Sequence, residues 1–481
     1  MKDKKNILMV AAECAPLAKT GGLADVVGTL PSYLNRMGFD CRVMIPYHRC
    51  IKEKYGDRVR HLSDYWFNLG WRSQYVGLEQ LDLNGVTVYL LDNEYYFGES
   101  IYLGGDREIE QYSWFSRAVC DILARLDFRP DLLHLNDWHT AIIPLLLKTQ
   151  YSSGSDFRGG LKTLLTIHNI AYQGKTSFGL VEDLLGVDRR YFTSEYMENY
   201  GAADFLKAGC VFADKINVPS PTNAKEVCTP EYGYGLEGIL AARGGDLHGI
   251  LNGIDRDSYD PASDPHLPAN YSAADPAGKS ECKRALLEEL GLQIQPSAPL
   301  FGMVSRLVFQ KGLDLVVDSL NWLMEQGAGL VVVGSGDPST ETLLRAAESR
   351  FKGRLCSYIA YDEGVSRRVY AGSDFFLMPS RFEPCGLAQM IAMRYGSLPV
   401  VRETGGLKDT VVPFNRFTGE GTGFSFTNYD GFEFRGAIAR ALEVYRDKAA
   451  LNKMISQAMA ADFSFSGPAR EYAAVYDSLI D

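Results

Sequence analysis

Short apolar runs alternate with segments of helical periodicity from one end of the chain to the other. The apolar runs are bounded by turn residues and have the length of buried β-strands; examples are NILMVAAE (6–13), RVMIPYH (42–48), TLLTIHN (163–169), PLFGMVSR (299–306) and FFLMPSR (375–381). Between two such runs, residues 110–127 repeat apolar side chains on one helical face, namely Phe115, Val119, Ile122 and Leu126. This alternation is typical of an α/β fold with parallel sheets.

The alternation stops once, in the polar, proline-rich stretch 260–276, and then starts again. A chain of 481 residues is also too long for one ordinary core. We therefore expect two Rossmann-like domains and a C-terminal helical segment, with the boundaries 1–250, 251–455 and 456–481. Tyr472 and Tyr476 recur at helical spacing in the last segment, which needs a surface to pack on and could return to the N-terminal domain.

Charge and cysteine content narrow the function classes. The net charge of −11 argues against nucleic acid and against an anionic membrane as partners, because both select basic patches. The nine cysteines are scattered without a CxxC motif, which favours a cytoplasmic protein. The basic start resembles a signal peptide, but its apolar stretch ends early, at Glu13, and we interpret it as the first buried strand.

The motif TGGLxDxV occurs twice, starting at Thr20 and at Thr404. The first copy follows a predicted strand and opens a predicted helix, where free N–H groups and the helix dipole attract phosphate or carboxylate. Lys19 adds a positive charge beside the first copy, whereas Glu403 stands in the matching place of the second. A plain capping turn with a solvent-exposed lysine is the alternative for the first copy.

Two loops of the second domain carry candidate chemistry. Arg306 and Lys311 lie in one predicted strand-to-helix loop, and two cations beside a helix start suit a diphosphate leaving group. Glu383 precedes a small-residue helix start at Cys385 and Gly386, which places a carboxylate beside helix N–H donors. Unpaired surface charges and a capping glutamate are the alternatives.

Other motifs give weaker evidence for a functional site. His168 ends a very apolar strand and should lie at the mouth of its sheet, where it is either a ligand-contacting residue or a satisfied core histidine. In the turn NDWH we favour positioning roles for Asp137 and His139 over metal binding. The single DxD, at Asp255 and Asp257, lies where carboxylates commonly shape turns, and no dinucleotide fingerprint, P-loop, HExxH or GxSxG occurs. We therefore expect no metal and no cofactor.

Taken together, KTGGLADV, NDWHT, TIHNIAYQG, NGID, SRLVFQKG, SRFEPCGL and TGGLKDTV closely resemble the bacterial glycogen synthase and plant starch synthase family. They stand in the order of that family and extend from about residue 19 to residue 411. The resemblance implies a GT-B fold, with two Rossmann-like domains facing each other across a deep cleft. It also implies retaining transfer of glucose from ADP-glucose to the non-reducing 4-OH of an α-1,4-glucan such as glycogen, without a required metal.

The same resemblance assigns roles by position. Catalytic roles fall on Glu383, His168, Arg306, Lys311 and Lys19. Substrate-binding roles fall on Lys19, Gly21, Gly22, Asp25, Asp137, Asn169, Asn252, Tyr361, Cys385, Gly386, Leu387 and Thr404. Arg306 and Lys311 would hold the diphosphate, Glu383 would lie near the glucosyl ring, and Tyr361 would lie near adenine.

Some positions depart from the family pattern, and they concern the details of sugar contact. Ile391 stands where the wider superfamily often has a second Glu, Ala388 where relatives often have Thr or Ile, and Phe465 where Trp is common.

Two rival functions remain open from the sequence. The same fold could use UDP-glucose or a small acceptor such as a sugar phosphate. A non-catalytic glucan- or nucleotide-binding protein is the second rival, but it predicts the loss of charged residues that are all present here.

Overall fold

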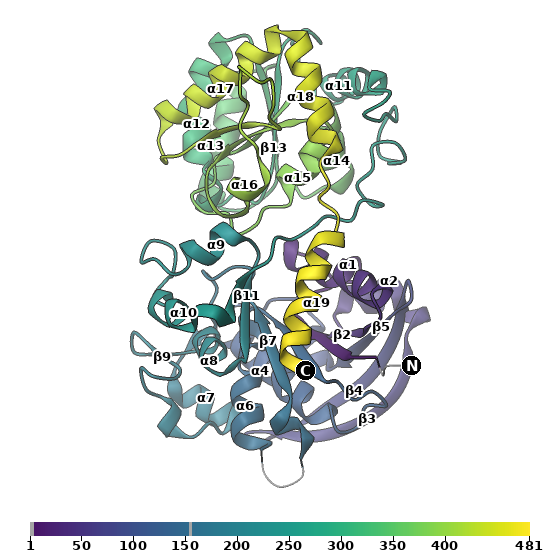
Figure 1. Ribbon diagram of the computed structural model, residues 1–481, viewed down its shortest axis with the longest axis vertical. Coiled ribbons are helices and arrows are strands. Elements are labelled where there is room, and N and C mark those ends of the chain that lie inside the picture. Colours follow the sequence, from purple (N-terminus) through teal and green to yellow (C-terminus); the bar gives the residue numbers. More distant parts are fainter. Residues whose placement is uncertain (1–3, 153–155) are drawn as a thin grey trace. The chain divides into compact units, whose positions relative to one another are not determined.

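The computed structural model describes residues 4–152 and 156–481. Within them the chain forms two compact units, one from the N-terminal part up to Gly253 together with Phe465–Asp481, and the other from Ile254–Ser464. The division falls in the segment LHGILNGID, and the last helix belongs to the first unit rather than to the second (Figure 1).

Unit 1 is built on one large sheet. In the described part of this unit its nine strands follow the order β12-β11-β7-β6-β1-β2-β5-β4-β3. Their bounds are β1 Asn6–Val10, β2 Asp40–Pro46, β3 Arg60–Leu69, β4 Arg72–Leu83, β5 Val86–Asp92, β6 Leu132–Asn136, β7 Lys162–Thr166, β11 Lys215–Val218 and β12 Leu247–Gly249. The strands from β12 to β5 are parallel, as predicted, whereas β3 and β4 add an antiparallel hairpin at one edge that the sequence analysis did not predict.

Helices cover both faces of this sheet. They are α1 Gly22–Arg36, α2 Arg49–Tyr55, α3 Glu94–Phe97, α4 Gly105–Ile122, α5 Trp138–Ala141, α6 Ile143–Gln150, α7 Phe178–Leu185, α8 Phe205–Phe212, α9 Pro221–Glu226, α10 Glu237–Arg243 and α19 Ser466–Ile480. The predicted helix 110–127 is α4, which ends earlier, at Ile122, so that Leu126 lies beyond it. A small sheet of β8 Lys175–Thr176, β10 Ala202–Asp204 and β9 Glu198–Asn199 lies after β7 in the chain.

The C-terminal helix α19 packs into the core of unit 1 beside α1 (Figure 1). Its apolar face buries Tyr472 and Tyr476, whose hydroxyls also satisfy polar side chains on the sheet. The Tyr476 hydroxyl lies 2.8 Å from Nδ1 of His134 on β6, and Asn217 on β11 donates to the Tyr472 hydroxyl at 2.8 Å. Burial lowers the pKa of His134 to about 3, so this histidine is a neutral core residue.

Unit 2 is a smaller parallel sheet flanked by helices. Within the described residues its six strands have the order β15-β14-β13-β16-β17-β18, with bounds β13 Leu300–Val304, β14 Gly329–Val333, β15 Leu355–Tyr358, β16 Phe375–Met378, β17 Leu398–Arg402 and β18 Phe424–Phe426. The helices are α11 Ala277–Glu289, α12 Leu313–Glu325, α13 Pro338–Arg350, α14 Glu363–Gly372, α15 Ala388–Arg394, α16 Gly405–Thr410, α17 Gly431–Arg446 and α18 Lys448–Ala460.

Strand order creates a switch point in each sheet. From β13 the chain proceeds to β14 and β15 on one side and then returns to β16 on the other. In unit 1, β1 is likewise flanked by β2 on one side and β6 on the other. Loops that leave the carboxyl ends of strands diverge at such points, and ligands of open α/β sheets bind there.

Candidate functional site

The candidate residues follow the carboxyl ends of neighbouring strands in each unit. In unit 1, Lys19 follows β1, Asp137 follows β6 and His168 follows β7, and these three strands are adjacent in the sheet. In unit 2, Lys311 follows β13 and Glu383 follows β16, which are also adjacent. Each unit therefore gathers these candidates at or beside its own switch point.

The first glycine turn opens α1, as predicted. Gly21 is the residue before the helix, and Gly22 is its first residue. Lys19 Nζ lies 2.6 Å from Oδ1 of Asp25, which is in the first helical turn. A helix of this length presents the positive end of its dipole to this loop. The Lys19 ammonium group and the free N–H groups of the first helical turn therefore lie in the same loop.

A buried carboxylate that the sequence analysis did not assign holds this loop. Glu13 accepts the Thr20 hydroxyl at 2.6 Å, and it also accepts the Thr20 backbone N–H and the Tyr102 hydroxyl. The sequence signal for this role is a glutamate at the end of a predicted buried strand. A buried carboxylate needs hydrogen-bond donors around it.

Asp137 and His168 form the second group of unit 1. Asp137 Oδ1 accepts the backbone N–H groups of His168 at 2.6 Å and of Asn169 at 3.4 Å. His168 Nε2 lies 2.9 Å from Oδ1 of Asn136, whose Nδ2 donates to the Val10 carbonyl, so Nε2 is the donor and the Nδ1 atom of His168 is an acceptor. Asp137 thus fixes the backbone of the predicted motif, and Asn136 fixes the imidazole.

Burial sets the charge of both groups. It lowers the pKa of His168 to about 4, so the imidazole is neutral at pH 7. It raises the pKa of Asp137 to about 7, although the two backbone N–H groups oppose this shift by stabilising the carboxylate. At neutral pH, His168 therefore offers a lone pair rather than a positive charge.

His139 and Asn252 occupy different surroundings. His139 is buried beside Tyr102, Tyr112 and Trp138, and burial lowers its pKa to about 3, so it is a neutral packing residue. Asn252 is buried after β12, and its Oδ1 atom has no hydrogen-bond partner within the described chain. An amide oxygen of this kind can accept a hydrogen bond from a ligand.

The switch point of unit 2 brings Lys311 and Glu383 together. Lys311 Nζ lies 2.6 Å from Glu383 Oε2, and the two side chains are only 15% and 8% exposed. Ser380 donates its hydroxyl to the same carboxylate oxygen at 3.0 Å. Arg306 lies exposed in the loop that also carries Lys311. Two cations and one carboxylate therefore belong to two neighbouring loops, although the sequence places Lys311 and Glu383 far apart.

These two loops are joined along their backbones. The Arg381 N–H donates to the Gln310 carbonyl at 2.9 Å, and Gln310 Nε2 donates to the Phe382 carbonyl at 3.0 Å. Gly312 has φ +72°, and a Cβ added there would lie 2.0 Å from the Pro379 carbonyl oxygen. The glycine after Lys311 therefore permits the close approach that places the lysine against Glu383.

The second glycine turn supports the Glu383 loop from another side. The Gly406 N–H donates to the Glu383 carbonyl at 3.1 Å and lies 3.2 Å from the Pro384 carbonyl. Gly405 has φ +43°, and a Cβ on it would lie 2.0 Å from the Glu383 carbonyl oxygen. Thr404 is fully buried. This turn contacts the backbone of the loop rather than presenting a charged side chain.

The residues after Glu383 are held by a buried glutamine. Gln389 Nε2 donates to the carbonyls of Cys385 at 3.1 Å and Gly386 at 2.8 Å. Gly386 has φ +72°, and Leu387 is the residue before α15. The sequence analysis missed Gln389, because it lies on a predicted helix among apolar residues. The only sign of its role in the sequence is that a polar residue stands four positions after Cys385.

Tyr361 lies apart from the Lys311 and Glu383 pair in the sheet order. It is an exposed residue of the loop between β15 and α14, and β14 and β13 separate β15 from β16.

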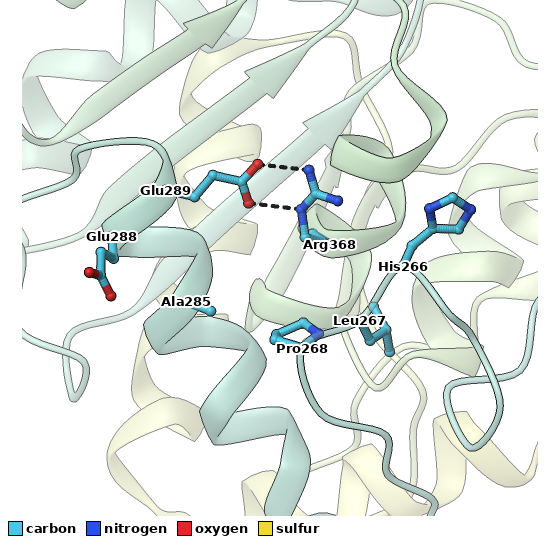
Figure 2. A pocket seen from close by; sticks show the side chains of 7 residues that line it. All are labelled: His266, Leu267, Pro268, Ala285, Glu288, Glu289 and Arg368. Carbon is cyan, nitrogen blue, oxygen red and sulfur yellow. Dashed lines mark hydrogen bonds and ion pairs between the residues drawn. The ribbon is translucent and has the colours of Figure 1, made fainter.

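A pocket of about 410 Å³ lies elsewhere in unit 2, where Leu267, Pro268 and Ala285 provide apolar walls (Figure 2). In Figure 2 the Arg368 guanidinium faces the Glu289 carboxylate, and two hydrogen bonds of 2.7 and 2.8 Å join them. These charges already satisfy each other, and none of the candidate residues lines this pocket.

Within residues 4–152 and 156–481, no helix has both the length and the apolar character to cross a membrane. The same residues contain no cluster of three or more His, Cys, Asp or Glu side chains that could hold a metal ion.

Comparison with known proteins identifies the family. Residues 6–242 match the family described as starch synthase catalytic domain, and residues 291–459 match glycosyl transferases group 1. The glycogen synthase of Lachnospira eligens is 44% identical over 478 residues, which cover 99% of this chain and 100% of that protein. The chain belongs to the glycogen and starch synthase family. It is therefore a glycosyltransferase.

Further relatives agree in sequence and in fold. The glycogen synthase of Caldicellulosiruptor bescii is 45% identical, with 99% of each chain covered. The catalytic domain of starch synthase IV from Arabidopsis thaliana, solved bound to ADP and acarbose, is 33% identical with a TM-score of 0.91 and 99% coverage of both chains. The predicted GT-B class with two parallel-sheet domains is thereby confirmed.

Proposed function

We propose that this glycosyltransferase is a glycogen synthase that transfers glucose from ADP-glucose to the non-reducing 4-OH of an α-1,4-glucan, with retention of configuration and release of ADP. The pairing of Lys311 with Glu383 at the switch point of unit 2 carries the proposal. It supplies a cation for a phosphate group and a carboxylate for a sugar within two adjoining loops. The relatives are glycogen synthases, and the starch synthase IV domain was solved with ADP and acarbose bound; both facts favour this donor and acceptor class.

The charges of unit 2 suit the leaving group. As the glycosidic bond breaks, negative charge gathers on the departing diphosphate while the sugar becomes oxocarbenium-like. Arg306 and Lys311 neutralise the diphosphate, and the Glu383 carboxylate positions the glucosyl ring and stabilises its positive charge. Gly405, Gly406 and Gln389 hold the backbone of residues 383–386 in place, and the N–H groups of Cys385, Gly386 and Leu387 contact sugar or phosphate.

The groups of unit 1 suit the sugar and the acceptor. His168 is neutral, and its Nδ1 accepts a hydrogen bond from a sugar hydroxyl, while Asp137 holds the backbone of His168 and Asn169. Lys19, paired with Asp25 at the start of α1, contacts ADP-glucose together with Gly21 and Gly22. Asn252 offers its amide oxygen to the substrate, Tyr361 lies near adenine, and the buried Thr404 acts by holding its turn.

Retention is proposed to proceed without a covalent glucosyl-enzyme. Retaining glycosidases place a nucleophilic carboxylate and an acid at a fixed separation, whereas the carboxylate of Glu383 is already paired with Lys311. The acceptor hydroxyl then attacks on the face from which ADP leaves, and the departing phosphate takes its proton. Trapping of a glucosyl ester on any Asp or Glu would overturn this mechanism.

Donor competition tests the reaction itself. Purified full-length protein should consume ADP-glucose with glycogen as acceptor and release ADP, and it should consume UDP-glucose more slowly. Faster use of UDP-glucose would correct the donor, and turnover only with a sugar phosphate as acceptor would correct the acceptor. If neither nucleotide sugar is consumed, the proposal fails.

A carboxylate variant tests the residue assignment. Glu383→Ala should lower kcat by at least about 100-fold while ADP still binds, because the carboxylate acts on the sugar rather than on the nucleotide. Glu403→Gln is the matched control, since Glu403 follows β17 and accepts a hydrogen bond from Ser425 at 2.7 Å. An unchanged rate for Glu383→Ala would refute the role assigned to this residue.

A further inference from the structure

Backbone conformation singles out two tyrosines of unit 1. Among the described residues, four that are not glycine have a positive φ: Asn84, Asp137, Tyr200 and Tyr234. Asn84 occupies a hairpin turn, and Asp137 belongs to the candidate site. A positive φ is a genuine outlier for a bulky side chain and marks a position worth explaining by function.

Tyr200 lies in a turn that disfavours it. Tyr200 and Gly201 connect β9 to β10 as a two-residue hairpin loop with φ values of +53° and +81°. The loop between β4 and β5 has almost the same geometry, with φ values of +53° and +85°, and there the residues are Asn84 and Gly85. Asn-Gly is the preferred pair for this turn. Tyr200 therefore occupies a backbone conformation that disfavours tyrosine, and we attribute its presence to a function of its ring.

A second Tyr-Gly turn packs against the first. Tyr234 and Gly235 have φ values of +51° and +87°. A Cβ on Gly235 would lie 2.7 Å from a ring carbon of Tyr200, so the Tyr200 ring rests on the glycine of the other turn. Gln173, which is buried, donates its Nε2 to the Tyr234 carbonyl at 3.1 Å and fixes this turn to the loop after β7.

A third tyrosine links this pair to the candidate site. Tyr172 lies in the loop that carries His168 and Asn169, and its N–H donates to the Asn169 carbonyl at 3.2 Å. The rings of Tyr172, Tyr200 and Tyr234 stay accessible, with 53%, 84% and 41% of each residue exposed. Tyr172 is close enough to Tyr234 to contribute, after burial, to the raised pKa of that hydroxyl. Lys175 Nζ lies 5.8 Å from the centre of the Tyr200 ring.

We propose that Tyr172, Tyr200 and Tyr234 form a binding platform for the α-1,4-glucan acceptor chain, away from its reacting end. This inference rests on the proposed function. Pyranose rings have apolar C–H faces that stack on aromatic rings, and their hydroxyls hydrogen-bond with phenols and ammonium groups such as Lys175. The platform is continuous with the loop of His168, so a chain whose end reacts there extends over the tyrosines. Turns that hold the rings rigidly reduce the entropy that binding must overcome.

Asparagine substitutions separate binding from folding. Tyr200→Asn and Tyr234→Asn remove a ring but suit the positive φ, so the thermal midpoint should stay equal or rise. The KM for glycogen and the Kd for maltoheptaose, measured by calorimetry without donor, should each increase about tenfold. The KM for ADP-glucose should not change, and kcat at saturating glycogen should change less than twofold.

Matched variants complete the test. Tyr200→Phe keeps the ring and should retain most of the glucan affinity, and Phe417→Ala removes an exposed ring from unit 2 without effect. Unchanged KM and Kd in both asparagine variants would overturn the platform, as would a lowered thermal midpoint with normal glucan binding. Wild-type protein that binds maltoheptaose but consumes no nucleotide sugar would refute the proposed function while leaving the platform testable by calorimetry.

Discussion

The two copies of TGGLxDxV are held in place by different chemistry. In unit 1 a side chain does this, because the Glu13 carboxylate accepts both the N–H and the hydroxyl of Thr20. In unit 2 the backbone does this, because the Gly406 N–H donates to the Glu383 carbonyl and Gly405 lies against the same carbonyl. The same motif, with six identical residues in eight positions, thus follows a lysine at the start of α1 in one unit and supports the Glu383 loop in the other.

The contrast extends to the residues around each turn. Unit 1 also uses a carboxylate, Asp137, to fix the backbone of His168, whereas unit 2 fixes Cys385 and Gly386 through the neutral amide of Gln389. Carboxylates titrate and glycine contacts do not. We therefore expect unit 1 to be sensitive to pH and unit 2 to be sensitive to any added Cβ.

The largest expected effect is that of a methyl group on the second turn. Gly405→Ala forces a left-handed alanine into the Glu383 carbonyl, 2.0 Å from the new Cβ, and should destabilise unit 2 by more than about 3 kcal/mol and lower kcat at least about 100-fold. Thermal unfolding and ADP-glucose turnover measure the two effects.

Gly21→Ala is the matched control in the first turn. Gly21 is extended, with φ −159°, and an added Cβ there meets nothing within 4 Å, so the thermal midpoint should stay within about 2 °C of wild type. Equal losses of stability in the two variants would break the comparison.

The next largest effect concerns two lysine–carboxylate ion pairs that have the same N···O distance but should contribute differently to stability. Lys311→Met leaves the Glu383 carboxylate buried without its cation and should cost about 3 kcal/mol, of which Lys311→Met/Glu383→Gln recovers part without restoring activity. Lys19→Met removes a pair that is also 2.6 Å long but whose side chains are 30% and 22% exposed, and should cost less than about 1 kcal/mol. Urea unfolding measures the free energy of unfolding of both variants. Similar losses in Lys311→Met and Lys19→Met would show that burial does not distinguish the two sites.

The sequence predicted the buried strands better than it predicted the contacts between loops. Buried parallel strands are continuous apolar runs, so β1, β7, β13 and β16 could be recognised without a structure. The β3–β4 hairpin was missed because its strands are long and partly exposed, and the mixed pattern does not resemble the runs of the buried strands.

The positions of the charged candidates could be predicted, but the residues that support them could not. Lys311 and Glu383 each lie in a predicted loop that leads from a buried strand into a helix. Their pairing depends on strand order, which brings β13 beside β16 and which no local pattern encodes. Gln389 binds the carbonyls of Cys385 and Gly386 just before its own helix, and Gly405 lies against the Glu383 carbonyl, which is distant in sequence. No periodic pattern of apolar residues encodes either contact.

The pH dependence of unit 1 follows from Asp137. Burial raises the pKa of Asp137 in the folded state to about 7, from an ordinary aspartate value of 3.8, so between these values the folded state holds a proton that the unfolded state has lost. The contribution of this group to stability is therefore greatest below about pH 4 and is lost as the pH rises to about 7. Asp137→Asn keeps an acceptor for the His168 N–H without the charge. It should become more stable than wild type by up to about 4 kcal/mol at pH 8 and show little gain at pH 4, as measured by thermal unfolding across this range. A difference that does not change with pH would show that Asp137 does not titrate in this window.

The smallest expected effect concerns the hydroxyl of the first turn. Thr20→Val removes the 2.6 Å hydrogen bond to Glu13 but keeps the shape of the side chain, and the carboxylate retains the Thr20 N–H and the Tyr102 hydroxyl as donors. The loss should therefore be about 1 kcal/mol, and it should appear mainly as a higher KM for ADP-glucose, because the loop carries Lys19. Thr20→Ser restores the donor and should restore the KM. In unit 2 the matching Thr404→Val should leave the KM for ADP-glucose unchanged, because that turn supports the Glu383 loop through the backbone of its glycines. If the two valine variants raise this KM equally, the two turns do not differ in the way that their contacts indicate.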